Sequence, residues 1–391
     1  MNQTIHNFQY FNINNIKKVV TSLITKHIQS DLGFILFTAI FSRFLVFLLA
    51  WLFNKSFDLN RTFKNLMCSW DCGWYTSIMT GGYDLAPHAH PNGDAANWAF
   101  FPLFPLLTKA LADSAGIHIL VASTIIVNLS FIVAMCVLYE YLKKLVDEDA
   151  ARFTAVLLAF SPYSLYFSAP YTEALYFLLM VSTLYCASSD KWIAAGLFAA
   201  ALSATRNLGV LLFFPLLAIG IKQHGLKPLI KLSNGTERVI LCLSLVPLGL
   251  FLYMFYLHQH VGDALAFKHV QVAWGRTVGS PFRIIGRAFS HENLFLNFSA
   301  VIACFGLFCG GYLLKKRFFT EGIILLIGTI IPLTTSINSI ARYTFSLFPI
   351  YLAIVLLTDR SPRIRMFVLY LFISLSGFCI MSWITGKDFM T

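Results

Sequence analysis

Long apolar runs separated by short polar stretches follow one another along most of the chain. They cover residues 32–53, 117–140, 152–168, 172–187, 192–205, 207–221, 239–257, 297–314, 321–337, 342–358 and 366–384. A helix needs about 20 apolar residues to span the hydrocarbon core of a bilayer, and several of these runs are shorter. The pattern predicts an all-α polytopic membrane protein with roughly 11 hydrophobic segments.

The composition strengthens this prediction. The chain has 391 residues, of which 58% are hydrophobic and 12% are charged, whereas a soluble domain carries about 25% charged residues. So few charges cannot cover a surface that faces water. The formal net charge of +11 therefore indicates cytoplasmic loops that contact anionic membrane lipid, and no basic tract suggests a nucleic-acid partner.

Lysine and arginine clusters predict the orientation, because cytoplasmic loops are enriched in them. With the runs above, residues 54–116 and 258–296 become large non-cytoplasmic loops, and the two termini lie on opposite sides. Residues 1–30 predict an amphipathic helix on the cytoplasmic membrane surface, and residues 31–391 a single polytopic domain. The clusters are Lys17/Lys18/Lys26, Lys143/Lys144, Lys222/Lys227/Lys231/Arg238, Lys315/Lys316/Arg317 and Arg360/Arg363/Arg365.

The first large loop contains CSWDCGWYTSIMTGGYD (residues 68–84), which holds Asp71 between Trp70 and Trp74 and just before Tyr75. Such aromatic residues suit the level of the lipid headgroups. A partly desolvated carboxylate there would be a competent general base. Alternatively, the tryptophans form an ordinary aromatic belt and the carboxylate caps a short helix.

The next segment, FFPLFPLLTKAL (residues 100–111), interrupts a run of Phe and Leu with Pro102 and Pro105. We expect a re-entrant or interfacial helix bent by proline, with an apolar groove beside Phe101 and Phe104 for a lipid chain. A kinked packing helix explains the segment equally well.

Charged residues near the ends of later runs fall on the same side as the first loop. Glu173 opens a span, where the helix dipole alone can explain it. Arg206 lies between two short apolar runs and Arg342 opens another, and arginine at membrane depth indicates an anion or a cavity. For Arg43, inside the first run, an internal carboxylate or carbonyl partner is expected.

The second large loop is cationic although it is predicted to be non-cytoplasmic. Lys268 and Arg276 lie there, near aromatic residues. This departure from the usual charge bias suggests an anionic ligand, and attraction to lipid headgroups is the alternative.

One carboxylate and several cations on one face fit a lipid-phosphate sugar donor, since a guanidinium can stabilise a departing phosphate. We expect Arg206 and Arg342 to approach the donor phosphate, with Lys268 and Arg276 as helpers. No metal or other cofactor is expected, because carboxylate pairs that would hold a divalent ion are missing from these motifs. Cys68 and Cys72 are expected to be free thiols, with a disulfide as the alternative.

At these residues the sequence resembles the PIG-V family, the mannosyltransferases that add the second mannose of GPI anchors, together with their prokaryotic relatives. The resemblance implies a GT-C-type fold, a lipid-phosphate-linked sugar, a site on the non-cytoplasmic face and Asp71 as catalytic residue. The matching motifs are Trp70-Asp71-x-x-Trp74-Tyr75, AFFPLFPLL (99–107), SAPYTE (168–173), ATRNxG (204–209) and Arg342-Tyr343.

The expected function is an inverting mannosyltransferase that moves a sugar from a polyprenyl (dolichyl) phosphate to a hydroxyl of a glycolipid or glycan. Residues 87–99, PHAHPNGDAANWA, depart from the eukaryotic pattern. They favour a prokaryotic relative in the plasma (inner) membrane over a protein of the endoplasmic reticulum. A transporter or lipid flippase, or a non-catalytic subunit of a glycosylation complex, are the alternatives.

Overall fold

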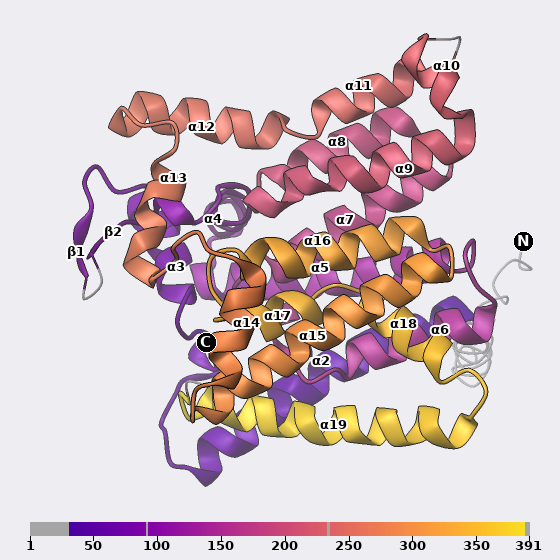
Figure 1. The fold of residues 1–391 in the computed structure, drawn as a ribbon. Helices are drawn as coiled ribbons and strands as arrows, with labels where there is room; N and C mark the ends of the chain where they lie inside the picture. The colour runs from indigo at the N-terminus through magenta and orange to yellow at the C-terminus, as the bar shows by residue number, and fades with distance from the viewer. Residues whose placement is uncertain (1–30, 91–92, 233–234, 388–391) are drawn as a thin grey trace, which may run out of the picture.

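The computed structural model describes residues 31–90, 93–232 and 235–387 (Figure 1). The amphipathic helix expected over residues 1–30 lies outside this range. In the described range the chain is mostly helical, and one short antiparallel hairpin pairs strand β1 (His88–His90) with β2 (Gly93–Ala95).

The helices follow one another in the order that the apolar runs predict. The α-helices are α2 (Asp31–Ser56), α3 (Cys72–Gly81), α4 (Leu103–Ala115), α5 (Ile119–Leu142), α6 (Glu148–Ala159), α7 (Glu173–Ser188), α8 (Trp192–Ser203), α9 (Phe213–His224), α10 (Leu226–Ile230), α11 (Glu237–Leu245), α12 (Leu248–Val261), α13 (Ala266–His269), α14 (Pro281–Phe289), α15 (Leu294–Lys315), α16 (Phe319–Leu333), α17 (Ile340–Phe345), α18 (Pro349–Leu357) and α19 (Pro362–Ile384). The 3-10 helices are η1 (Phe63–Asn65), η2 (Asn97–Ala99), η3 (Ser164–Phe167), η4 (Asn207–Leu212) and η5 (Val270–Trp274).

Six helical segments of the described chain are long and apolar enough to cross a membrane: α2, α5, η4–α9, α11–α12, α15 and α19. This confirms the prediction of an all-α polytopic membrane protein. The count of eleven segments is not confirmed, since α7, α8 and α16 are apolar but shorter. Most residues of α7 are buried, and it packs against α5 and α8, so protein covers much of its surface.

The two ends of the helix bundle differ in their loops. Figure 1 shows α3, the β1–β2 hairpin and α13 at one end, and α6, α10 and the α18–α19 connection at the other. The basic clusters at residues 143–144, 222–231 and 360–365 adjoin that second set of elements. These clusters therefore share one end of the bundle, as the charge pattern predicts.

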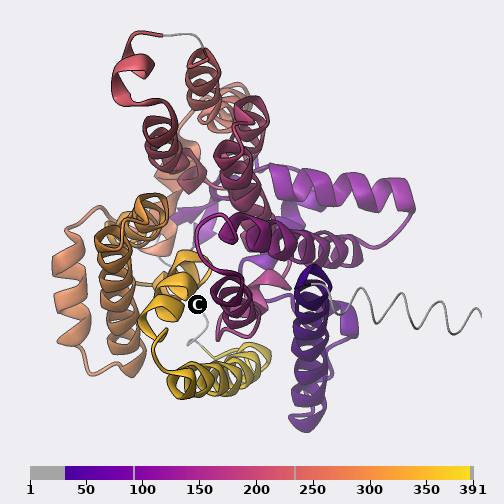
Figure 2. The ribbon, with the colours of Figure 1, turned by 90° about the vertical axis from the view of Figure 1, so that its right-hand side faces the viewer.

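Helix α4 lies across the direction of the long helices: Figure 1 views it end-on and Figure 2 views it lengthwise. This orientation suits an interfacial helix. The expected proline bend is wrong, because Pro102 directly precedes the helix and Pro105 occupies its first turn. Proline fits there since the first helical N–H groups have no partner inside the helix.

Arg43 is buried inside α2, as its position in the first apolar run implies. Its guanidinium donates to the carbonyl oxygens of Ser164 and Ala159 at 2.6 and 3.1 Å. The prediction of an internal partner for this residue is confirmed. These bonds tie α2 to the end of α6 and to η3, the segment that leads into the SAPYTE motif.

Candidate active site

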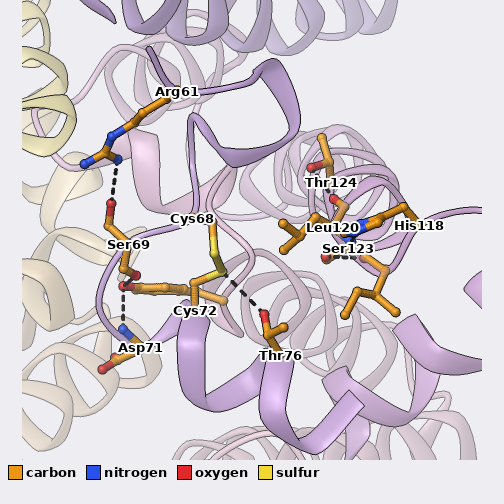
Figure 3. The surroundings of a disulfide bond; sticks show 12 residues. Arg61, Cys68, Ser69, Asp71, Cys72, Thr76, His118, Leu120, Ser123 and Thr124 are labelled. Atoms are coloured by element: carbon orange, nitrogen blue, oxygen red, sulfur yellow. Dashed lines mark hydrogen bonds between the residues drawn. A yellow bond between two sulfur atoms is a disulfide. The ribbon is translucent and has the colours of Figure 1, made fainter. Parts of the chain in front are cut away.

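A disulfide fixes the turn that carries Asp71. Cys68 and Cys72 are bonded, with their Cα atoms 5.3 Å apart, at the start of α3 (Figure 3). The expectation of free thiols is wrong: the chain folds back over Ser69 and Trp70 to begin the helix, which brings the two cysteines within bonding range.

The backbone of this turn is strained and held from outside. Trp70 has φ +44°, a left-handed conformation that costs a bulky residue about 1–3 kcal/mol. The Tyr171 hydroxyl accepts the Asp71 N–H at 3.1 Å and donates to the Ser69 carbonyl at 2.7 Å. The SAPYTE motif thus anchors the first loop. Because the Asp71 side chain makes no capping bond to α3, the helix-cap interpretation is wrong.

The side chain of Asp71 instead joins a network of four charges. Arg342 Nη1 lies 2.9 Å from Asp71 Oδ2, and Arg342 Nε lies 2.7 Å from Glu173 Oε1. Arg206 Nη1 lies 3.1 Å from the same Glu173 oxygen. The first loop therefore meets the start of α7 at Glu173, the break at Arg206 and the helix α17, which carries Arg342, as their shared side in the sequence suggests.

Burial distinguishes the two acids of this network. The Glu173 side chain is 0% exposed, whereas that of Asp71 is 26% exposed. The second oxygen of Glu173, Oε2, is buried with no partner in the described chain. The second oxygen of Asp71, Oδ1, also has no bonded partner among the described residues, but its carboxylate reaches a cavity. Asp71 is accordingly the acid that a ligand can reach.

Tyrosine rings line the guanidinium groups. The Arg342 guanidinium carbon lies 4.9 Å from the centre of the Tyr171 ring and 5.2 Å from that of Tyr166. Arg206 lies 5.0 Å from the Tyr343 ring. Such contacts, together with the carboxylates, offset the cost of removing arginine from water. Tyr171 and Tyr343 were not predicted as site residues, although both lie inside the matching motifs, because the prediction there selected charged side chains.

A cavity of about 740 Å³ opens beside the network. It brings together residues from both large loops, from the break at Arg206 and from α17. Asp71 is the one acid among the described residues that line it. The cavity is lined by Asp71, Tyr75, Ala99, Phe100, Phe101, Thr205, Arg206, Asn207, Phe267, Lys268, His269, Gln271, Val272, Trp274, Arg276, Thr277, Val278, Thr334, Thr335, Arg342 and Tyr343.

The net charge facing the cavity is positive. The two guanidiniums of Arg206 and Arg342 are balanced by the carboxylates of Asp71 and Glu173. Lys268 and Arg276 also line the cavity, but neither is paired with an acid in the described part of the chain. The Arg276 guanidinium donates to Gln271 Oε1 at 2.8 Å and to the Tyr343 hydroxyl at 3.2 Å, which aims it at the network. These two side chains supply the unbalanced charge.

Four predicted site residues do not line this cavity. Trp70 and Trp74 face a separate groove. Glu173 is buried behind the arginines, and Phe104 is fully buried with its ring 5.3 Å from that of Tyr75. The expected lipid groove beside Phe104 is therefore wrong for that residue, because its side chain fills the protein core instead.

No group of three or more His, Cys, Asp or Glu residues that could hold a metal occurs in the described range.

The sequence pattern of the family described as "Mannosyltransferase (PIG-V)" matches residues 53–262, which is more than half of the chain. The chain belongs to the PIG-V mannosyltransferase family. The match contains Asp71, Glu173 and Arg206 and ends before Lys268, Arg276 and Arg342. Those three residues belong to the site because they line the cavity, not because the family pattern covers them.

A curated relative of this family member is the GPI mannosyltransferase 2 of Cryptococcus neoformans var. neoformans, 26% identical over 199 residues. The match covers 46% of this chain and 45% of that protein, so the chain spans less than half of the relative's length.

Two similar solved structures are of oligosaccharyltransferase from Archaeoglobus fulgidus. One, a complex with zinc and sulfate, has a TM-score of 0.42 at 16% identity and covers 80% of this chain and 48% of that one. The other, with an inhibitory peptide and a dolichol-phosphate, has a TM-score of 0.43 at 14% identity and covers 90% and 56%.

Proposed function

We propose that this PIG-V family member is an inverting GT-C-type glycosyltransferase. It moves mannose from a polyprenyl (dolichyl) phosphate to a hydroxyl of a glycolipid or glycan. The observation that carries the proposal is the cavity, in which the accessible carboxylate of Asp71 faces Lys268 and Arg276, cations that no acid of the described chain balances.

The reaction needs one base and one anion-binding site. The anomeric C–O bond of the lipid-linked sugar breaks, and its electron pair leaves with the phosphate. The acceptor oxygen forms the new C–O bond from the opposite side, so the anomeric configuration inverts. Its proton passes to Asp71 Oδ1, while Arg342 holds Oδ2. The products are the glycoside and the polyprenyl phosphate.

Charge balance supports a phosphate site at the second large loop. Arg206 and Arg342 are already paired with carboxylates, which weakens them as anion ligands. Lys268 and Arg276 have no acidic partner in the described chain and face the same cavity, so they best stabilise the departing phosphate. In this assignment Arg342 positions the base, and Arg206 completes the network at the cavity wall.

The lipid chain has an apolar path next to this site. A crevice between α7, η4–α9 and α16 shares Arg206 and Tyr343 with the cavity. The space enclosed by this crevice is only about 50 Å³, so an isoprenoid chain would lie along its open side, with its phosphate at the cavity and its hydrocarbon against apolar side chains. The crevice is also lined by Glu173, Tyr176, Met180, Leu208, Leu211, Leu212, Pro215, Ile324, Ile327, Gly328, Ser346 and Leu347.

The membrane orientation follows from the basic clusters at one end of the bundle. The end with residues 143–144, 222–231 and 360–365 would be cytoplasmic, because such loops are enriched in lysine and arginine. The first large loop, with Asp71, would then face the other side. The proposal therefore places the reaction on the non-cytoplasmic face.

Purified protein in lipid, supplied with polyprenyl-phosphate β-mannose and extracts of membrane glycolipid, tests the proposed function. We expect release of polyprenyl phosphate and an α-linked product. Parallel reactions with glucose and galactose donors check the sugar. If none of these donors is cleaved in the presence of acceptor, the proposed reaction is wrong.

Replacing Lys268 or Arg276 with alanine is expected to raise the KM for the sugar donor about 10- to 100-fold. A hydrogen bond to a charged group contributes about 1.5–3 kcal/mol, which corresponds to that range. Arg287→Ala is the matched control, because it removes a cation of the same loop that does not line the cavity. Equal effects of all three changes would support general attraction to lipid headgroups instead.

A further inference from the structure

A second groove, of about 390 Å³, lies along the other side of the turn that carries Asp71. Its lining shares no residue with the larger cavity. The groove is lined by Trp70, Gly73, Trp74, Ser77, Asp84 and His88. The proposed reaction leaves it without a role.

The side chains of this groove suit a neutral sugar. Indole rings, here Trp70 and Trp74, can stack on the apolar face of a pyranose ring, while Ser77, Asp84 and His88 can bond its hydroxyls. Among the residues that the structure describes, no lysine or arginine lines the groove, and Asp84 contributes a negative charge. A phosphate-bearing ligand would therefore be disfavoured, in contrast to the larger cavity.

The floor of the groove is open at Gly73. A Cβ atom built at this position meets nothing within 4 Å. Gly73, Trp74 and Ser77 are spaced so that they share one side of the first turns of α3. Trp70 lies in the left-handed turn before the helix and lines the same groove. A side chain larger than glycine at this point would fill the space between the tryptophans and the loop that holds Asp84.

The walls of the groove are held in place. The Trp70 ring lies edge-on to Trp383 with centroids 4.8 Å apart, and Trp74 stacks on Phe100 at 5.9 Å. Asp84 Oδ2 accepts the Asn97 N–H at 2.8 Å. Its other oxygen lies 3.6 Å from His88 Nε2, whose side chain is 70% exposed. Rings fixed in this way lose little freedom when a ligand binds.

The groove adjoins the proposed reaction centre. Trp74 also lies edge-on to Trp274 at 5.4 Å, and both Phe100 and Trp274 line the larger cavity. Trp74 therefore packs in the wall between the two spaces. Trp70, which lines the groove, directly precedes Asp71, which lines the larger cavity.

We infer that this groove is a carbohydrate subsite. It holds a sugar residue of the acceptor next to the one whose hydroxyl reacts at Asp71. The assignment to the acceptor rests on the proposed function, whereas carbohydrate binding itself rests on the groove.

A pair of glycine variants in α3 tests this inference. Gly73→Leu fills the groove, and Gly81→Leu is its matched control, because Gly81 is equally open but lies outside the groove. Protein in lipid nanodiscs is titrated with neutral methyl glycosides of mannose, glucose, galactose and N-acetylglucosamine, as di- and trisaccharides. We expect wild type and Gly81→Leu to bind at least one of them, and Gly73→Leu to bind it at least about tenfold more weakly.

Asp84→Asn is a second variant, which leaves the groove open; we expect it to bind the same glycoside more weakly than wild type. Wild-type affinity in Gly73→Leu, or no binding of any of these glycosides by wild type, would overturn the inference. Cleavage of the mannosyl donor is measured on the same preparations. If the donor is cleaved while Gly73→Leu binds normally, only the groove assignment falls. If binding is lost in Gly73→Leu but no donor is cleaved, the proposed reaction falls and the carbohydrate subsite stands.

Discussion

Asp71→Asn is expected to lower turnover about 10²- to 10⁴-fold, the usual contribution of a general base. The amide keeps the shape of the side chain, and its oxygen can still accept the bond from Arg342, now at 2.9 Å. The variant should therefore fold and bind the sugar donor almost as wild type does. Turnover is measured as release of polyprenyl phosphate at saturating donor and acceptor.

Asp58→Asn is the control for this prediction, because Asp58 is an exposed acid of the same loop with φ +50°, a conformation that asparagine tolerates. Turnover of Asp71→Asn within a few-fold of wild type would show that Asp71 only holds Arg342. The search for a base would then move to Asp84, Asp94, Glu173 or Asp263. Of these, Asp263 is a weak candidate because the hydrogen bond from His269 lowers the pKa of its carboxyl.

The helices could be predicted from the sequence because long apolar runs are typical of membrane helices. All eleven runs coincide with helical structure. The number of spans could not be predicted, since a short run such as that of α7 is apolar whether lipid or protein covers it. The positions of Pro102 and Pro105 within their helix could not be predicted for a related reason. Proline occurs in the first turn of a helix and also at bends, and the sequence alone does not distinguish the two.

The grouping of the charged residues was also predictable, but their pairing was not. Topology alone places Asp71, Glu173, Arg206 and Arg342 on one side. Arg342 and Glu173 lie 169 positions apart in sequence, and nothing local shows that their side chains meet at 2.7 Å. Both arginines are paired with carboxylates, and for this reason the proposed phosphate site is at Lys268 and Arg276, which the sequence suggests only as helpers.

The aromatic residues around Asp71 show a second limit of sequence reasoning. Trp70 and Trp74 flank the acid along the chain, which suggests that all three serve one site. The turn into α3 separates them: Trp70 and Trp74 line the groove with Gly73, whereas Asp71, at the start of the helix, lines the cavity. Tyr75, four residues after Asp71, shares the cavity with it. Neighbours in sequence thus divide between two spaces.

The buried acid of the network provides the sharpest test of this division of roles. Glu173→Gln is expected to lower the free energy of unfolding by about 3–5 kcal/mol, because it leaves the buried guanidinium of Arg342 and the partly buried one of Arg206 without their shared carboxylate. Both Arg342 Nε and Arg206 Nη1 bond the same oxygen of Glu173, whose side chain is 0% exposed. An amide oxygen can accept these bonds but cannot balance the charge.

The measurement is the denaturant midpoint of purified protein in mixed micelles, with Asp71→Asn as the matched variant. Asp71→Asn removes one charge from the same network, but at a partly exposed position where water can compensate. The midpoint of Asp71→Asn should stay close to that of wild type, while its turnover falls as predicted above. The midpoint of Glu173→Gln should lie clearly below both. A Glu173→Gln protein that is stable but inactive would reverse the assignment. Glu173 would then be an acid of the reaction, and the accessible carboxylate of Asp71 would serve to position Arg342.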